Sequence, residues 1–155
     1  KGISQVSLTT LGAAYTQNFD GLTNSGTSSV VPTGWAFSEA GTNANTTYAA
    51  GTGSGNTGET FSFGATSATD RAFGSLASGS LQTKIGASFV NNTGSTITSL
   101  AISYVGEEWR LGVQSRTDQM NFEYSLNATS LTSGTWLPVT ALNFVTPNTS
   151  TVVGA

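Results

Sequence analysis

This chain of 155 residues contains no cysteine and no histidine, and only 8% of its residues are charged. Without these two residue types it cannot build a Ser-His-Asp or Cys-His triad, a zinc site with cysteine or histidine ligands, or a thiol redox centre. Long hydrophobic runs are missing too, and no segment approaches the roughly 20 apolar residues of a membrane helix. We therefore expect a protein that is not an enzyme and does not insert into a membrane.

Positive charge is equally scarce. Five basic residues stand against eight acidic ones, which gives a net charge of −3. Because phosphate binding needs a cationic surface, we expect no nucleic-acid partner. Thr, Ser and Gly supply 66 of the 155 residues, and such a composition without cysteine favours a secreted protein or one on the extracellular surface of a bacterium. The N-terminus has no hydrophobic signal core, so we expect that a signal peptide has been removed.

The hydrophobic pattern predicts an all-β fold. Aromatic residues are spread along the chain, which argues against disorder, and no apolar pattern of helical spacing is long enough for a confident helix. We expect one domain, 1–155, built as an antiparallel β-sandwich. The expected strands are 5–10, 15–19, 34–38, 60–64, 71–76, 84–90, 97–111, 119–127, 136–139, 142–145 and 151–153.

Two parts of this pattern make sharper predictions. The turn 91–94 is typical of a hairpin that leads into 97–111. In 119–127, apolar and polar residues alternate, so Met120, Phe122, Tyr124 and Leu126 should share a buried face. Residues 41–58 show no hydrophobic period and are expected to form a long surface loop.

Five segments occur in an order that resembles a known type of module. They are Tyr15-Thr-Gln-Asn-Phe-Asp-Gly-Leu22, Pro32-Thr-Gly-Trp35, Asp70-Arg-Ala-Phe-Gly-Ser-Leu76, Gly86-Ala-Ser-Phe-Val-Asn-Asn-Thr-Gly94 and Gly106-Glu-Glu-Trp-Arg110. Together they resemble the jelly-roll modules of large secreted or surface-anchored bacterial proteins, which are mostly uncharacterised, similar to carbohydrate-binding modules, and often found beside nuclease, phosphatase or adhesin-like regions. The resemblance covers nearly the whole chain and implies a jelly-roll-like fold, but no particular activity.

The end of the chain departs from this resemblance. The resembling modules continue with further strands and an acidic closing segment, whereas this sequence stops at Ala155. The sandwich is then incomplete and closed by a strand from another chain, or the sequence is part of a longer polypeptide. The candidate assembly residues lie in the two end segments: Ile3, Val6, Leu8, Val152 and Val153.

Candidate ligand-binding residues are an aromatic side chain within the long loop and polar groups near aromatic rings. Sugar rings stack on aromatic faces, while amides and carboxylates bind their hydroxyl groups. Tyr48 is the best candidate for an exposed contact, although an aromatic ring that folds back onto the sandwich is the more common outcome. Asn45, Trp109 and Glu107 complete the set.

The carboxylates offer two further interpretations. Glu107 and Glu108 are adjacent, so on a strand they point to opposite sides and form a poor acid/base pair; Arg110 is expected to pair with Glu108 or Glu123. Asp20, Glu39 and Asp70 lie at expected turns, where Ca²⁺ collects carboxylates, but local hydrogen bonding is the favoured alternative. Ca²⁺ is the one cofactor that the sequence suggests.

Three functions remain open at this point. The first is a non-catalytic extracellular adhesion or binding module that recognises carbohydrate, with a surface glycan as its partner. The second is a structural subunit that binds copies of itself and forms a filament or surface array by exchanging strands. The third is an accessory module of a secreted hydrolase.

Overall fold

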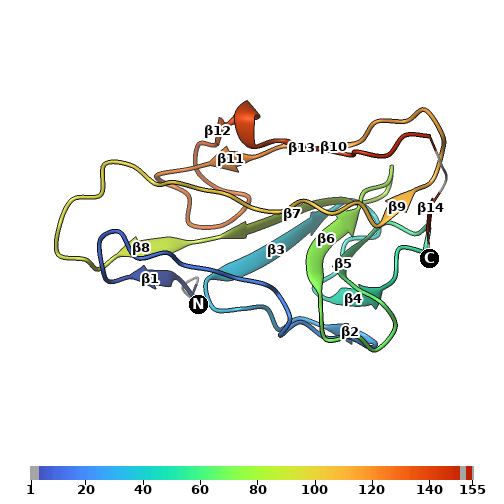
Figure 1. Cartoon of the computed structure of the whole chain (residues 1–155), viewed down its shortest axis with the longest axis horizontal. Coiled ribbons are helices and arrows are strands. Elements are labelled where there is room, and N and C mark those ends of the chain that lie inside the picture. The colour runs from blue at the N-terminus through green and yellow to red at the C-terminus, as the bar shows by residue number, and fades with distance from the viewer. Residues whose placement is uncertain (1–3, 151–152, 155) are drawn as a thin grey trace.

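Figure 1 shows the computed structural model of the chain, which describes residues 4–150 and 153–154. Short strands make up nearly all of its regular structure, with one 3-10 turn near the C-terminal end. The elements are β1 (Val6–Leu8), β2 (Thr27–Ser28), β3 (Trp35–Ala40), β4 (Tyr48–Gly51), β5 (Glu59–Phe63), β6 (Ala72–Leu76), β7 (Gln82–Ala87), β8 (Phe89–Asn91), β9 (Arg110–Leu111), β10 (Gln119–Met120), β11 (Glu123–Tyr124), β12 (Leu137–Pro138), η1 (Thr140–Leu142), β13 (Phe144–Val145) and β14 (Val153–Gly154).

The strands form several small sheets, most of them antiparallel. The largest has the order β2-β4-β5-β6, and the longest ladder joins β3 to β7. Shorter pairs are β10 with β13, β11 with β12, and β14 with β9. Only β1 with β8 and β4 with β5 pair in parallel among the described strands. The prediction of an all-β, sandwich-like architecture is confirmed at this level.

Aromatic rings form the core between β3 and the four-stranded sheet. Tyr48 at the start of β4 is 1% exposed, and its ring lies edge-on to Phe37 and Phe73 at centroid distances of 5.9 and 5.6 Å. Phe19 joins the cluster through Trp35, at 4.6 Å, and through Phe73. Edge-to-face packing of this kind adds to the burial of apolar area. β3 is therefore held from one side by a packed aromatic layer.

A buried arginine fixes the neighbouring end of the sheet. Arg71 is 4% exposed, and its guanidinium donates to the hydroxyl and carbonyl oxygens of Ser62 and to the carbonyl oxygen of Ala65. Its backbone N–H donates to the carboxylate of Asp20 at 3.2 Å. These bonds satisfy a cation that would otherwise be costly to bury. Arg71 is thus part of the scaffold.

The second half of the chain differs from the expected pattern. The turn at 91–94 forms, since the Asn91 carboxamide accepts from Thr93 and Gly94 has φ +75°. It makes no hairpin, however, because β8 pairs with β1, and 95–109 form no strand. The hairpin prediction is wrong, since β8 pairs with the distant N-terminal strand β1 and not with the residues that follow the turn.

Most of the face predicted to be buried in 119–127 is exposed, although Phe122 is half-buried and stacks on Tyr104. Met120, Tyr124 and Leu126 are 48%, 43% and 91% exposed. β10 and β11 are two residues long and separated by two residues, so neither spans enough of a sheet to bury a continuous face. Residues 15–19 also form no strand; there Asn18 bonds the side chain and the backbone N–H of Asp20. Local alternation alone did not determine burial.

Candidate functional site

The candidate site begins at the turn that starts β3. The N–H of Trp35 donates to the carbonyl oxygen of Pro32 at 2.9 Å, and Gly34 between them has φ +84°. A positive φ at the third turn position favours glycine, and a Cβ there would lie 2.5 Å from Val6 Cγ2. The Pro-Thr-Gly-Trp segment therefore sets where β3 begins and how it is rotated.

The β3–β7 ladder determines which backbone groups of β3 face outward. In an antiparallel ladder, alternate residues point their N–H and C=O groups at the partner strand, and the residues between them point to the opposite edge. The bond from Ser88 N–H to the Gly34 carbonyl, 2.8 Å, continues the ladder and shows that even-numbered residues face β7. The backbone N–H and C=O groups of the odd-numbered residues consequently point away from β7; these residues are Trp35, Phe37 and Glu39.

That outer edge of β3 has no partner strand among the described residues. Within the same residues, the N–H and C=O groups of Phe37 and Glu39 form no hydrogen bond to another part of the chain. Unpaired backbone groups in a row are the structural feature to which an additional strand binds. β3 thus has one satisfied edge and one available edge.

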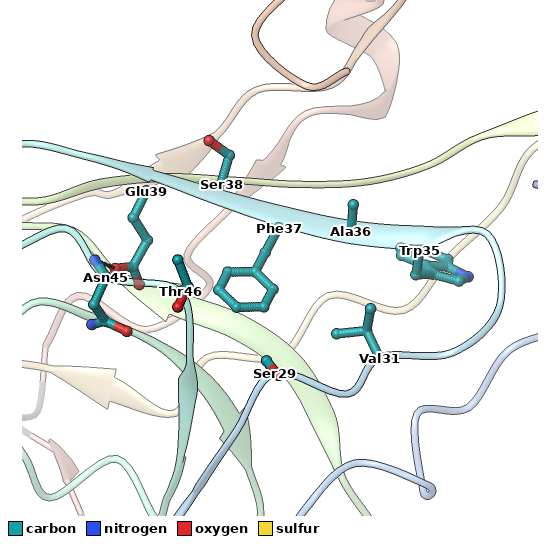
Figure 2. Close-up of a pocket in the computed structure, with 9 residues that line it drawn as sticks. All are labelled: Ser29, Val31, Trp35, Ala36, Phe37, Ser38, Glu39, Asn45 and Thr46. Carbon is teal, nitrogen blue, oxygen red and sulfur yellow. Dashed lines mark hydrogen bonds between the residues drawn. The ribbon is translucent and has the colours of Figure 1, made fainter. Parts of the chain in front are cut away.

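A groove of about 440 Å³ runs along β3. In Figure 2, Phe37 and Glu39 project from one side of the strand, toward Ser29 and the segment of Asn45, while Ala36 and Ser38 project from the other. Side chains of both alternating sets line the groove, which is the arrangement expected along a strand edge rather than over one face of a sheet. The lining residues are Ser29, Val31, Trp35, Ala36, Phe37, Ser38, Glu39, Asn45 and Thr46.

The polar end of the groove is a pair of carboxyl groups. Glu39 Oε1 accepts from the hydroxyl and the N–H of Thr60, at 2.6 and 3.1 Å, and Oε2 accepts from the N–H of Asn45 at 2.9 Å. The Asn45 carboxamide donates to both oxygens of Glu59, at 3.5 and 3.2 Å. The Thr60 N–H also donates to Glu59 at 2.9 Å, so a single amide bridges the two carboxyl groups.

The two carboxyl groups titrate differently. Burial acts to raise the pKa of Glu39, but hydrogen bonds from Thr60 and Asn45 outweigh it and lower the pKa below the usual value. Burial, followed by the hydrogen bond to Glu39, raises the pKa of Glu59. The pair therefore holds its first negative charge on Glu39. No lysine or arginine forms an ion pair with either carboxyl group within the described chain.

Each described basic side chain is engaged or directed elsewhere. Arg71 binds carbonyl groups in the core, Arg110 donates to the carbonyl oxygens of Gly53 and Ser54, and Arg116 pairs with Asp118 at 2.7 Å. Lys84 lies directly opposite Ser38 in the ladder, so it shares the face of Ser38 and not that of Glu39. The prediction that Arg110 pairs with Glu108 or Glu123 is wrong, because two backbone carbonyl groups hold it instead.

The sequence-predicted contact residues do not form one site. Tyr48 is not an exposed contact residue but follows the alternative given for it, a ring that folds back into the core. β4 occupies 48–51 within the expected loop, and the Tyr48 hydroxyl donates to the Val30 carbonyl oxygen and accepts from the Thr23 N–H. Asn45 does lie at the groove. Trp109 stacks on Phe63 at 5.9 Å and donates through its indole N–H to Glu107, and neither Trp109 nor Glu107 lines the groove.

The three predicted calcium ligands, Asp20, Glu39 and Asp70, do not lie together as one set. No three carboxylates lie together as a metal site anywhere in the part of the chain that the structure describes. Asp20 bonds Asn18 and the Arg71 N–H, as the favoured alternative predicts, whereas Glu39 lies beside Glu59. Asp20 accepts from the N–H of Arg71, the residue after Asp70, near the start of β6, whereas Glu39 binds Thr60 near the start of β5. The set Asp20, Glu39 and Asp70 is therefore not one site, because Glu39 lies at the other end of the β5–β6 pair.

The candidate assembly residues fall partly on paired strands. Val6 and Leu8 lie on β1, which pairs with β8, and Val153 lies on β14, which pairs with β9. Ile3 and Val152 lie outside the described residues. Exchange of these end segments stays a prediction, whereas the available edge belongs to β3, which sequence reasoning did not single out.

Comparisons with family models, curated proteins and solved structures find no match to this chain. None of the described helical segments has the length and hydrophobicity to cross a bilayer. The site therefore has to be interpreted from its own geometry. The sequence signals that pointed toward it were the Pro-Thr-Gly-Trp turn, which fixes the start of β3, and the separate candidates Asn45 and Glu39, but none of them indicated an unpaired edge on β3.

Proposed function

We propose that this protein is a non-catalytic extracellular binding module that accepts an extended polypeptide segment along the outer edge of β3. The observation that carries the proposal is the coincidence of unpaired backbone groups at Phe37 and Glu39 with a groove along the same edge. Each backbone hydrogen bond to an added strand contributes about 0.5–1.5 kcal/mol net. Groove side chains then select among segments.

The proposal develops the interpretation of a strand-exchanging structural subunit on a bacterial surface. In a jelly-roll-like sandwich that is closed by a strand from another chain, the incoming strand would need an edge such as that of β3. The groove is bordered by Ser29 and Val31 in the segment after β2 and by Asn45 and Thr46 in the segment before β4. Because segments border the groove on both sides, a single extended polypeptide segment fits along this edge more readily than the edge strand of a folded domain does.

Carbohydrate recognition is the second candidate, and the same groove supports it. Trp35 and Asn45 line the groove, and aromatic rings beside amides are typical of sugar sites. It ranks below strand binding because the ring faces are already used: Trp35 packs against Phe19 and donates to Tyr15, and Phe37 packs against Tyr48 and Phe73. A role beside a secreted hydrolase has no separate support in this geometry.

The test uses proline to remove one outward N–H. A phage library of random decapeptides is selected on the protein, and the enriched peptides are synthesised. Glu39→Ala and Glu39→Pro both lack the carboxylate, but only Glu39→Pro lacks the outward N–H, which the ladder to β7 does not use. We expect peptide affinity to fall roughly tenfold or more from Glu39→Ala to Glu39→Pro, as the loss of about 1.4 kcal/mol implies.

Folding is monitored separately. The N–H of Ser38 points into the ladder, so Ser38→Pro should lower the melting temperature strongly relative to the parent protein. The difference in melting temperature between Glu39→Ala and Glu39→Pro should be much smaller. Equal peptide affinity of the alanine and proline variants of Glu39, or a selection that enriches no peptide, would refute strand addition at β3. Binding of a neutral glycan that Glu39→Pro leaves unchanged would favour the second candidate.

A further inference from the structure

The further inference concerns the chemistry of the segment that binds and rests on the proposed function. We infer that the segment added to β3 is cationic, with a lysine or arginine placed against the carboxyl pair of Glu39 and Glu59. The observations behind it are the position of this pair at one end of the groove, the absence of a described lysine or arginine that pairs with it, and an acceptor position of Glu39 that is unoccupied when Glu59 is ionised.

The acceptor position follows from a count of hydrogen bonds. A carboxylate offers about four lone-pair positions. Glu39 accepts two hydrogen bonds from Thr60 at Oε1 and one from the N–H of Asn45 at Oε2, and a protonated Glu59 carboxyl group also donates to it. When Glu59 is ionised, one acceptor position of Glu39 is therefore unoccupied, and because Glu39 is half-buried and lines the groove, that position is available to a ligand. A lysine ammonium or arginine guanidinium supplies the matching donor and charge.

The position of the pair relative to β3 makes the charge selective. Side chains of an added strand lie directly across from those of β3, on the same face and within about 5.5 Å. A residue opposite Glu39 would therefore share the face that carries the carboxyl pair. Like charges directly opposite are destabilising, so an aspartate or glutamate there is rejected.

No other part of the groove offsets this selection. Glu39 is the one charged residue in the lining, and its remaining members are apolar, hydroxyl or amide side chains. Lys84, the basic residue nearest in the ladder, lies on the opposite face of β3 and β7. An anionic segment would find no compensating cation at this edge among the described residues, whereas a cationic segment would find an uncompensated pair.

The experiment compares charge variants of the selected peptide. In one enriched decapeptide, the single lysine or arginine that selection conserves is replaced by glutamine and by glutamate, and affinity is measured by fluorescence anisotropy at low salt. We expect the glutamine peptide to bind roughly tenfold more weakly than the parent, the glutamate peptide more weakly still, and the preference to shrink as salt screens the charges.

The protein variant removes both carboxyl groups. Glu39→Gln alone leaves the carboxyl group of Glu59 in place, and burial, the main cause of its raised pKa, is unchanged while the contribution of Glu39 is altered. The informative variant is therefore Glu39→Gln with Glu59→Gln. It should reduce the preference for the cationic peptide to less than about twofold. The matched control, Glu107→Gln with Glu123→Gln, removes two exposed carboxylates outside the groove and should leave the preference unchanged.

The outcomes separate the two claims. Selection of peptides with no basic residue, or equal binding of lysine and glutamine peptides that still depends on the Glu39 N–H, overturns the cationic inference and leaves strand addition standing. Preference retained in the double glutamine variant also overturns it. If peptide binding is insensitive to proline at residue 39, strand addition itself fails. If the groove bound a neutral oligosaccharide selectively and bound no peptide, it would be a carbohydrate-binding site and not a strand-binding site.

Discussion

Tyr48→Phe tests most directly whether the residue belongs to the core or to a contact surface. The Tyr48 ring is 1% exposed, and its hydroxyl donates to the Val30 carbonyl at 2.8 Å while accepting from the Thr23 N–H at 3.1 Å. Without the hydroxyl, the half-buried Thr23 N–H loses its acceptor, whereas the carbonyl of Val30, whose side chain is 73% exposed, can bind water. A newly unsatisfied buried group costs about 1–3 kcal/mol.

We therefore expect Tyr48→Phe to reduce the free energy of unfolding by about 1–2 kcal/mol. In a chain of this size that corresponds to roughly 2–8 °C in melting temperature. Tyr48→Ala also removes the ring that packs against Phe37 and Phe73, and the expected loss is about 3–5 kcal/mol. Urea denaturation followed by tryptophan fluorescence, with a thermal melt by circular dichroism, measures both.

Tyr124→Phe provides the matched control. Tyr124 is 43% exposed, and we expect its variant to stay within about 0.5 kcal/mol of the parent. If Tyr48→Phe were as stable as Tyr124→Phe, the two hydroxyl bonds would contribute nothing. If Tyr48→Ala folded normally and lost only ligand binding, the surface-contact interpretation would be correct and the packing argument wrong.

Three further predictions concern β3 and its carboxyl pair. In the free protein, amide hydrogen exchange followed by NMR should be roughly tenfold or more faster at Phe37 and Glu39 than at Ser38, because of these three residues only Ser38 donates its N–H to β7. Equal protection of the three amides would contradict the conclusion that the N–H groups of Phe37 and Glu39 point away from β7. For Glu59, the pKa is raised on folding, so its stabilising contribution is present below the unfolded value and is lost as pH rises through the folded pKa. Glu59→Gln, which stays neutral, should then raise stability at neutral pH by up to about 1 kcal/mol after solvent screening, and the gain should vanish at about pH 3. Glu39→Gln should do the opposite at neutral pH, because the lowered pKa of Glu39 stabilises the fold above its unfolded value. A gain from Glu59→Gln that persists in acid would show that charge is not its cause.

Much of the first half of the fold follows from local chemistry. The expected strands 34–38, 60–64 and 71–76 match β3, β5 and β6 within two residues at each end, because each lies between turn signals such as Pro32-Thr-Gly-Trp35. In the second half, the equally regular pattern of 119–127 did not lead to burial. Periodicity states which side chains share a face, but a partner element decides whether that face is covered.

The candidate site shows the same division. Sequence reasoning named Asn45 and Glu39, for a ligand and for a metal respectively, but gave no reason to place them together. They meet because β3 and the segment before β4 bring the Asn45 N–H to Glu39 Oε2 at 2.9 Å, with Thr60 of β5 beneath them. Glu59 joins from the start of β5, 20 positions along the chain from Glu39.

The sequence by itself determined the inventory: no histidine and no cysteine, five basic residues, and a β-rich pattern with turns. Only the tertiary structure decided that Tyr48 lies in the core, that β1 pairs with β8, and that the outer edge of β3, beside two carboxyl groups, has no partner strand among the described residues. The physical reason is that strand pairing is non-local. Nearly every residue carries the same backbone N–H and C=O groups, so the sequence does not show which of them are paired. Whether they form hydrogen bonds depends on which distant segment the fold places along that edge.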